Sequence, residues 1–504
     1  MNPTLSHAKV LVVGAGIMGA GIAQVAAQAG YSVYLMDARE GAAQHACIKL
    51  RASLDALLAK GKFTQEAVDA ILARIRPVDS LAEAADADLV IEAIVENLDA
   101  KRALFSELET LVAEACVLAS NTSSLSITAI AKGLRVPGRV VGMHFFNPVP
   151  LMKLVEVVAG LQTAPEVAQA IFDLSKAWGK VPVHARSTPG FIVNRIARPF
   201  YAEALALLHE QAARPEVIDA CMRAIGFRMG PCELIDLIGH DTNFAVTQAV
   251  YAANFFDKRY TPSLVQSALV DGGMLGRKSG RGIYDYAAGS KPPAVAVQTL
   301  PLPAISHLQL HSRSQDEQTM SEWQERLQAK GIAVDLVAAS AWTGMQVGDL
   351  QISQTDGRPA SALGAQVVVY DWHLQQGGAP VLAFAASSGA TENNIDLAKA
   401  LLGALGFAPQ RVADQPGLVA ARTLAMLVNE AADAVQQGVC DPAGADAAMK
   451  LGVNYPAGPF EWLARWGAPA VVQVLEALDA HYRGERYRVS PWLRHAVWQS
   501  QHAA

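Results

Sequence analysis

The sequence predicts an α/β protein in which a doubly wound sheet domain precedes an all-α domain, with a degenerate second copy of the helical domain after it. Three observations predict this arrangement. A glycine-rich turn joins the first strand to the first helix, and strands then alternate with helices to about residue 187, where a purely helical pattern begins. Finally, TPGFIVNR at residues 188–195 recurs as QPGLVAAR at 415–422, an offset of 227 residues.

The first strand, turn and helix carry a dinucleotide-binding pattern. A buried strand at 10–13 is followed by G-x-G-x-x-G and by an apolar helix to about residue 29. Missing side chains permit the tight turn and the close approach of a diphosphate, while the helix N-terminus supplies N–H donors and a positive dipole. The sequence therefore predicts a Rossmann-type domain whose cofactor contacts include Gly14, Gly16, Ile17, Met18 and Gly19.

Asp37 indicates which dinucleotide binds. It closes the second strand eighteen residues after Gly19, where a carboxylate accepts a hydrogen bond from the adenosine ribose 2'-hydroxyl. Because a 2'-phosphate would meet a like charge there, Asp37 favours NAD over NADP. Arg39 is close enough to keep NADP as the alternative.

Further strands end in polar residues. The strand in ADLVIEAIVEN is followed by a helix, and then by strands in CVLASN, GRVVGMHFFN and KLVEVV. Ligands of doubly wound sheets bind at the carboxyl ends of the strands. The polar residues expected near that edge are Glu96, Asn97, Asn121, Ser123, His144, Asn147 and Glu156.

Changes in composition and hydrophobic periodicity along the chain predict five segments. They are a NAD-binding sheet domain at 1–187, a helical substrate and dimerisation domain at 188–286, a linker at 287–318, a degenerate sheet-like segment at 319–410, and the second helical copy at 411–504. Glu203 and Glu430 match at the repeat offset, whereas Asn194 is matched by Ala421. Because residues 290–410 contain no G-x-G-x-x-G, we expect the second copy to be structural.

The composition excludes several classes of protein. The charged fraction is 17% and the apolar fraction 51%, which excludes a mainly disordered chain. A formal charge of −6 gives no general attraction to nucleic acid or anionic lipid, and no apolar run is long enough to span a membrane. Five scattered cysteines without a C-x-x-C pair argue against a disulfide framework or zinc site, so we expect no metal and a cytoplasmic location.

Six motifs together carry a family resemblance: GAGIMGAGIA, IEAIVEN, SNTSSL, HFFNPVPLMKLVEVV, STPGFIVNR and MGPCELIDLIG. In this order they resemble the L-3-hydroxyacyl-CoA dehydrogenase family, over roughly residues 8–286. The length, the second copy and the ending GERYR resemble the long bacterial form assigned to 3-hydroxyadipyl-CoA oxidation in phenylacetate degradation. The resemblance implies NAD, a CoA-thioester substrate, and either a homodimer or an intrachain pseudo-dimer, because short family members pair through their helical domains.

His144 is the candidate base. Oxidation of a secondary alcohol removes a hydroxyl proton as hydride leaves the same carbon, and imidazole suits this role near neutral pH. In the family the matching histidine pairs with the glutamate that matches Glu156, which would fix the tautomer and stabilise the imidazolium. The alternatives are a structural histidine and a charged residue at a strand edge.

The resemblance implies that Ser123 hydrogen-bonds the substrate's 3-oxygen and that Asn194 lines the acyl pocket. The alternatives are a serine that caps the helix starting near Ser126 for Ser123, and an ordinary polar helix residue for Asn194. We expect Ser124 to cap the helix that starts near Ser126. Asn147 is either a supporting substrate contact or a turn residue. The remaining implied cofactor residues are Glu96 and Lys101, which a bare helical pattern would leave solvent-exposed.

Arg198 is the hypothetical partner of a distal substrate carboxylate. It lies four residues after Asn194, and thus on the same face if the helix is unbroken, although Pro199 favours a kink. A surface or CoA-contacting arginine is the alternative. Three other functions stay open: a general short-chain 3-hydroxybutyryl-CoA dehydrogenase, a dehydrogenase of free 3-hydroxy acids, and a non-catalytic dinucleotide-binding structural protein.

Overall fold

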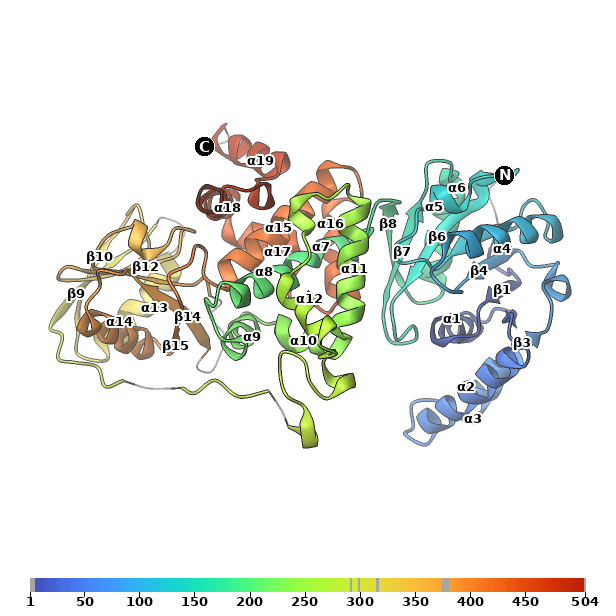
Figure 1. The fold of residues 1–504 in the computed structure, drawn as a ribbon, viewed down its shortest axis with the longest axis horizontal. Coiled ribbons are helices and arrows are strands. Elements are labelled where there is room, and N and C mark those ends of the chain that lie inside the picture. The colour runs from blue at the N-terminus through green and yellow to red at the C-terminus, as the bar shows by residue number, and fades with distance from the viewer. Residues whose placement is uncertain (1–4, 291, 298–299, 314–316, 374–379, 503–504) are drawn as a thin grey trace. The chain divides into compact units, whose positions relative to one another are not determined.

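The computed structural model describes residues 5–290, 292–297, 300–313, 317–373 and 380–502, drawn as a ribbon in Figure 1. The chain forms two compact units. The first contains the chain up to Arg195 together with Ala434–Asn454, and the second contains Ile196–Asp433 and Tyr455–Ala504.

In the described part of the first unit, eight strands form one sheet in the order β3-β2-β1-β4-β5-β6-β7-β8. They are β1 Val10–Val13, β2 Val33–Met36, β3 Ile75–Val78, β4 Leu89–Glu92, β5 Val117–Ser120, β6 Val140–Phe145, β7 Leu154–Ala159 and β8 Val181–Arg186. The β6–β7 pair is antiparallel and the other pairs are parallel. The chain order reverses beside β1, which is where doubly wound sheets bind ligands.

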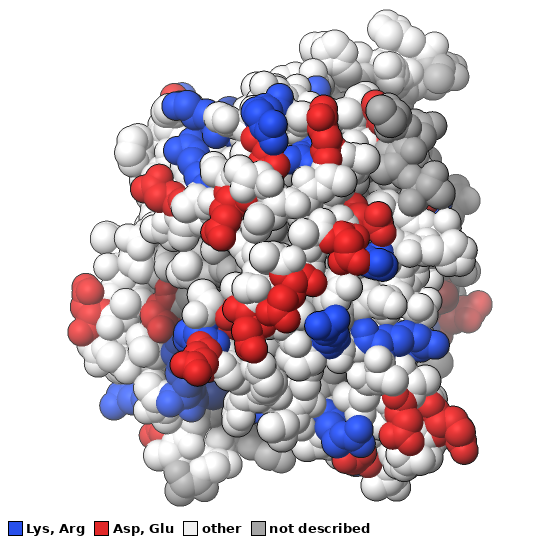
Figure 2. All heavy atoms as spheres, turned by 90° about the vertical axis from the view of Figure 1, so that its right-hand side faces the viewer, with Lys and Arg blue, Asp and Glu red and all other residues white. Residues whose placement is uncertain are grey.

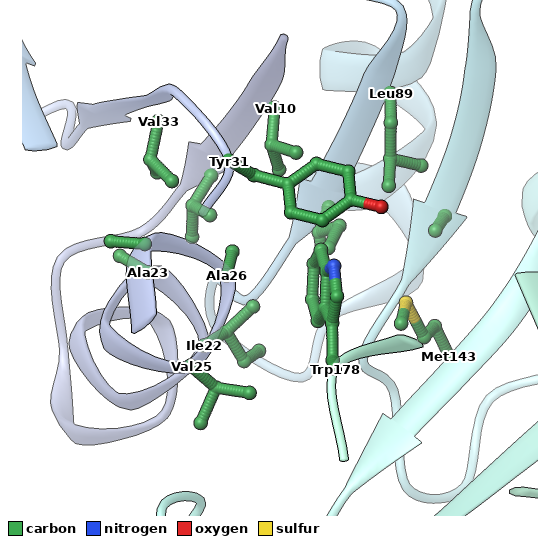
Figure 3. Close-up of a cluster of buried hydrophobic side chains, with 14 of the residues drawn as sticks. Val10, Ile22, Ala23, Val25, Ala26, Tyr31, Val33, Leu89, Met143 and Trp178 are labelled. Atoms are coloured by element: carbon green, nitrogen blue, oxygen red, sulfur yellow. The ribbon is translucent and has the colours of Figure 1, made fainter. Parts of the chain in front are cut away.

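The helices of this unit are α1 Ile17–Gln28, α2 Ala42–Leu58, α3 Gln65–Ala73, α4 Leu98–Leu111, α5 Ile127–Ile130 and α6 Pro165–Ala177, with α7 Val193–Ile196 at its boundary. Its core is apolar: Ile22 of α1, Val10 of β1 and Trp178 after α6 belong to one buried cluster (Figure 3). Helix α16, Pro442–Gly452, comes from the later helical copy, yet it packs on β7 and β8.

The second unit combines both helical copies with another sheet. The first copy supplies α8 Arg198–His209, α9 Pro215–Ala224, α10 Pro231–Ile238, α11 His240–Ala253 and α12 Leu264–Asp271. The later copy supplies most of α15 Ala420–Gln436, together with α17 Pro459–Trp466, α18 Ala468–Tyr482 and α19 Pro491–His502.

The two helical copies contact each other reciprocally within this unit. Glu203 and Glu430, which are 227 positions apart, each accept hydrogen bonds from an Arg-Tyr pair of the other copy. Arg486 and Tyr487 contact Glu203 at 2.8 and 3.1 Å, and Arg259 and Tyr260 contact Glu430 at 3.4 and 2.6 Å. Such exchange of equivalent contacts is the geometry of a two-fold interface.

Among the described residues between 307 and 411, seven strands form a sheet in the order β10-β9-β11-β12-β13-β14-β15. They are β9 His307–His311, β10 Ala333–Val337, β11 Gly344–Val347, β12 Leu350–Gln354, β13 Val367–Tyr370, β14 Val381–Ala386 and β15 Ala408–Arg411, with α13 Glu317–Gln328 and α14 Glu392–Ala404. Strand β9 therefore lies inside the segment predicted as a linker. The β13–β14–β15 pairing repeats that of β6–β7–β8.

Two classes of site are missing from the described residues. No helix there is long and apolar enough to cross a membrane, and no cluster of three or more histidine, cysteine or acidic side chains is suited to a metal ion. The five cysteines are free. Acidic and basic side chains are interspersed on the face in Figure 2.

Candidate active site

The glycines after β1 leave space in front of the N-terminus of α1. A Cβ on Gly14, whose φ is +105°, would lie 2.5 Å from the carbonyl oxygen of Ala93, and a Cβ on Gly19 would lie 1.7 Å from that of Gly14. The space beside Gly16 is open. Ile17 is 79% exposed, whereas Met18 packs against the core. The loop therefore fits a dinucleotide diphosphate, with Gly16 and the backbone of the first turn facing it.

Asp37 is fixed at the end of β2. Its Oδ2 accepts the N–H of Ala15 at 2.8 Å, and its Oδ1 accepts Nε of Arg39 at 3.1 Å. Partial burial alone would raise the pKa of Asp37, but the hydrogen bonds from Arg39 and Ala15 outweigh it and hold the pKa below its usual value. The ionised carboxylate can accept a hydrogen bond from a ribose hydroxyl. It also pairs with Arg39, the arginine that would have to bind the 2'-phosphate of NADP.

The sheet register brings His144 and Glu156 together. They are directly opposite each other in the antiparallel β6–β7 pair, and Nδ1 of His144 lies 2.6 Å from Oε2 of Glu156. His144 is 6% exposed and Glu156 fully buried. The rings of Phe146 and Phe191 pack beside the imidazole.

The second oxygen of Glu156 holds the start of α7. Its Oε1 accepts the N–H groups of Ile192 and Val193 at 3.0 and 2.9 Å. The next residue is Asn194, which is half-buried. One carboxylate therefore fixes both the histidine and the segment that carries the predicted acyl-pocket asparagine.

The second copy lacks this pair. At the repeat offset of 227 residues, the second copy has Asp371 at the position of His144 and Ala383 at the position of Glu156. The Asp371 carboxylate accepts N–H groups of Val419, Ala420 and Ala421 at 2.6 to 3.0 Å, at the beginning of α15. It retains the anchoring of the helix but offers no imidazole.

Ser123 lies beside Glu96. Oε1 of Glu96 accepts hydrogen bonds from the N–H of Ser123 at 3.0 Å, from the Ser123 hydroxyl at 3.3 Å and from the Thr122 hydroxyl at 2.6 Å. Burial would raise the pKa of Glu96, but the Thr122 hydroxyl and the charge of Lys101 lower it on balance. The expectation that Ser124 caps a helix is wrong: Ser124 also bonds Glu96, and Ser126 caps α5 by accepting the N–H of Ala129.

Lys101 is not solvent-exposed. Its side chain is 1% exposed, and its Nζ lies 2.6 Å from Oε1 of Glu92 and 3.2 Å from Oε2 of Glu96. Glu92 also accepts the hydroxyl of Ser120 at 2.6 Å. Sequence reasoning missed Glu92, although a lone carboxylate ending an apolar strand is a detectable signal.

Asn147 lies on the β6–β7 loop, and a buried lysine stabilises this loop through hydrogen bonds. Nζ of Lys180 donates to the carbonyl oxygens of Val149 and Met152 at 2.5 and 2.8 Å. Burial lowers the pKa of Lys180 to about 8. Asn147 lines a cavity of 1080 Å³ beside α1 and α2, together with Gly16, Arg39, His45, Lys49 and Lys60.

Arg198 differs from its predicted setting. The helix is broken at Ala197, between α7 and α8, because Pro199 lacks an N–H and its ring would clash with the carbonyl of Arg195. The premise of an unbroken helix is therefore wrong. The expectation of a surface arginine is also wrong, since Arg198 is 6% exposed.

Comparison with family models assigns nearly the whole chain. Residues 9–188 match the NAD binding domain of 3-hydroxyacyl-CoA dehydrogenase, and both 190–286 and 417–502 match its C-terminal domain. Residues 352–416 match a reduced Rossmann-fold domain of 3-hydroxybutyryl-CoA dehydrogenase.

Similar proteins agree with this assignment. The chain is 43% identical to 3-hydroxyadipyl-CoA dehydrogenase of Escherichia coli over 96% of both chains, and 41% identical to the mitochondrial hydroxyacyl-coenzyme A dehydrogenase of Sus scrofa over 55% of this chain and 90% of that one. A crystal structure of an Escherichia coli 3-hydroxybutyryl-CoA dehydrogenase is 42% identical, covers 99% of this chain and all of its own, and has a TM-score of 0.89. The chain belongs to the 3-hydroxyacyl-CoA dehydrogenase family and is an NAD-dependent enzyme.

Proposed function

We propose that this enzyme oxidises 3-hydroxyadipyl-CoA to 3-oxoadipyl-CoA. The observation that carries the chemistry is the buried His144–Glu156 pair, 2.6 Å apart, whose carboxylate is itself anchored to α7. The substrate rests on the 43% identity, over nearly the full chain, to a relative named for this acyl-CoA. The same likeness supports a place in phenylacetate catabolism.

In the proposed mechanism, His144 takes the proton of the substrate's 3-hydroxyl. When Oε2 of Glu156 accepts Nδ1–H, the lone pair of Nε2 is left to receive that proton. The carboxylate then stabilises the imidazolium that results. Bound NAD supplies the acceptor for the hydride that leaves the same carbon.

Ser123 and Asn194 position the reacting carbon. The Ser123 hydroxyl donates to the 3-oxygen as its charge changes, which stabilises the developing carbonyl. Asn194 contacts the acyl group beside the anchored start of α7, and Asn147 contacts the thioester side from the β6–β7 loop. These roles are supported by the short chain distance from Val193 to Asn194 and by the position of Asn147 three residues after His144.

The cofactor residues act in two sets. Gly14, Gly16, Ile17, Met18 and Gly19 form the diphosphate loop, and Asp37 binds the adenosine ribose. Glu96 binds the nicotinamide ribose, and Lys101 acts through Glu96 by holding its carboxylate at 3.2 Å. The cavity beside α2 suits the CoA phosphates, because Arg39, Lys49 and Lys60 line it.

We further propose that the chain is its own pseudo-dimer rather than half of a homodimer. The reciprocal contacts of Glu203 and Glu430 support this, because they occupy the interface that a second chain would use. The free cysteines support a cytoplasmic location.

Kinetics with two six-carbon substrates test the substrate assignment. We expect kcat/KM with NAD to be at least about a hundredfold higher for 3-hydroxyadipyl-CoA than for 3-hydroxyhexanoyl-CoA, which lacks the distal carboxylate. Equal values would favour the second candidate, a general short-chain 3-hydroxybutyryl-CoA dehydrogenase, which the similar Escherichia coli crystal structure supports. Turnover of neither substrate would contradict the proposed function.

A further inference from the structure

A circuit of hydrogen bonds joins the segments that follow β4 and β5 in the first unit. Glu92 ends β4 and Ser120 ends β5, and the two residues are directly opposite each other in this parallel pair. Oε2 of Glu92 accepts the Ser120 hydroxyl at 2.6 Å, and its Oε1 lies 2.6 Å from Nζ of Lys101. Glu92 therefore connects the end of β5 with helix α4.

The circuit closes through residues next to Ser123. Nζ of Lys101 lies 3.2 Å from Oε2 of Glu96, and Oε1 of Glu96 accepts the Thr122 hydroxyl at 2.6 Å. The N–H of Thr122 in turn donates to Oγ of Ser120 at 3.2 Å. Ser123 is attached to the circuit, because Glu96 accepts its N–H at 3.0 Å. The name Glu92 ring is used for the closed circuit of Glu92, Lys101, Glu96, Thr122 and Ser120.

The Glu92 ring is buried except at Glu96. The other members are enclosed by the sheet domain, whereas the side chain of Glu96 is partly exposed. Burying charged groups costs free energy, and an apolar cluster of similar volume often stabilises a fold equally well. What a buried and hydrogen-bonded circuit adds is a single rigid geometry for the groups attached to it.

The second copy forms the same sheet edge without this glutamate. Ser353 of β12 pairs with Val369 of β13, which lies 227 positions after the Gly142 that pairs with Ser120, so Ser353 occupies the position of Ser120. Opposite Ser353 on β11 is Gly344, where a Cβ would lie 2.0 Å from the backbone of β12. The Ser353 hydroxyl is buried and has no hydrogen-bond partner in the described part of the chain. The copy without the proposed base therefore also lacks the carboxylate of the ring.

The groups attached to the Glu92 ring contact both reactants in the proposed mechanism. Glu96 binds the nicotinamide ribose, and Ser123 donates to the substrate's 3-oxygen. Hydride transfer requires the reacting carbon and the nicotinamide to be aligned, and a misplacement of about 1 Å costs about a hundredfold in rate. A rigid connection between Glu96 and Ser123 meets this requirement.

We propose that Glu92 is a positioning residue that fixes Glu96 and Ser123 relative to each other. It acts through Lys101 on one side of the ring and through Ser120 on the other. The proposal rests on the proposed function, because that function gives Glu96 and Ser123 their roles. It adds a buried group that aligns cofactor and substrate without contacting either.

Two variants of the full-length enzyme open the ring on either side of one hydrogen bond: Glu92→Gln and Ser120→Ala. With the six-carbon substrate that wild type prefers, we expect Glu92→Gln to raise the KM for NAD about tenfold and to lower kcat at least about tenfold. Ser120→Ala should change both values about threefold in the same directions. The double variant should match Glu92→Gln within about twofold, because both changes interrupt the same circuit.

Glu109→Gln is the matched control. Glu109 is a buried carboxylate on the same helix, and it pairs with the buried Arg139 at 3.4 Å. It lies about 12 Å further along the helix axis than Lys101, and no printed contact connects it to the ring. We expect this variant to lower the unfolding temperature, as Glu92→Gln does, yet to leave kcat and the KM for NAD within about twofold of wild type.

Fluorescence titration with NADH gives a readout without turnover. The dissociation constant should rise about tenfold in Glu92→Gln and about threefold in Ser120→Ala, and it should not change in Glu109→Gln. A loss of folded protein would lower the number of binding sites but not the affinity of the sites that remain. Affinity therefore separates positioning from general destabilisation.

The outcomes separate the two proposals. Unchanged NADH affinity and KM for NAD in both ring variants, or equal changes in Glu109→Gln, would overturn the positioning role while leaving the dehydrogenase intact. If Glu92→Gln does not fold, Ser120→Ala decides by the same measurements. Turnover of neither six-carbon substrate by wild type would overturn the proposed function, and the NADH titration would still decide the role of Glu92.

Discussion

At the scale of single residues, carboxylates organise this site. Glu156 divides its two oxygens between the imidazole of His144 and the N–H groups at the start of α7. Glu96 and Glu92 share Lys101. Glu156, Glu92 and Lys101 are buried, whereas the Glu96 side chain is 36% exposed. Because each carboxylate accepts several hydrogen bonds, their roles can be separated by substitutions that keep the shape of the side chain.

Glu156→Gln should lower kcat about a thousandfold or more, because the amide neither stabilises an imidazolium nor enforces the tautomer with Nε2 unprotonated. The measurement is the pH profile of kcat for wild type and variant. Thermal unfolding is the control, since an amide oxygen can still accept the N–H groups of Ile192 and Val193. A kcat within threefold of wild type would exclude this role for Glu156.

Lys101→Met should destabilise the protein by about 3–5 kcal/mol, because it leaves two carboxylates without their buried cation. The KM for NAD should also rise if Lys101 positions Glu96. Urea unfolding and NAD titration give the two readouts. Arg102→Met is the matched control on the same helix. The Arg102 side chain is 31% exposed, and its ion pair with Asp99 is long, at 4.0 Å. Equal effects of the two substitutions would contradict the prediction.

At the scale of elements, the register of β6 against β7 decides the active site. A shift by one residue would turn His144 and Glu156 to opposite faces of the sheet. The loop between these strands also depends on one lysine, since Lys180 donates to the carbonyl oxygens of Val149 and Met152. Strand pairing thus positions His144, the proposed base, and Lys180 holds the loop that carries Asn147.

Lys180 makes stability depend on pH in the alkaline range. Its pKa is lowered from 10.5 to about 8 by burial, so the unfolded chain binds more protons than the folded one between these values. Relative to Lys180→Met, wild type should therefore gain stability as the pH rises from about 8 to 10.5, by at most about 1.4 kcal/mol per pH unit. The neutral amine keeps its donors to both carbonyls.

Urea unfolding of wild type and Lys180→Met at pH 7.5 and 9.5 checks this sign. The difference between the two proteins removes the contribution of every other titrating group. A difference that stays constant, or that moves against wild type at the higher pH, would contradict the prediction.

At the scale of the whole molecule, the second copy has kept its packing and lost its chemistry. Asp371 and Ala383 stand at the positions of His144 and Glu156, yet the contacts of Glu203 and Glu430 with the opposite copy are intact. Helix α16 of this copy even covers β7 and β8 in the first unit. This contrast supports the proposal that its function is structural, as a partner for the first copy within one chain.

Removal of residues 410–504 should cause aggregation, because it strips buried helices such as α15 from the first copy and α16 from β7 and β8. The full-length chain should sediment as a monomer across the micromolar range. Light scattering of the truncated chain and analytical centrifugation of the intact one are the measurements. A truncated chain that is monodisperse and equally stable, or an intact chain that dimerises, would refute the pseudo-dimer.

The sequence determined features that depend on local order along the chain. The glycine turn before α1, the carboxylate after β2, the polar residues at strand ends and the repeat offset of 227 are all readable from spacing. The family motifs added the pairing of His144 with Glu156. The break at Pro199 was an open alternative, since proline permits but does not require one.

Only the tertiary structure decided what depends on contacts between distant segments. Lys101 is buried next to Glu92 and Glu96, and Lys180 donates hydrogen bonds to the β6–β7 loop. Arg198 is enclosed near Tyr201 and Tyr455. From the linear sequence alone, these groups would be expected to be solvent-exposed or unrelated to one another. The physical reason is that burial is a property of packing. A charged or phenolic side chain enters a protein interior only where other elements supply its partners, and those elements are far away in sequence.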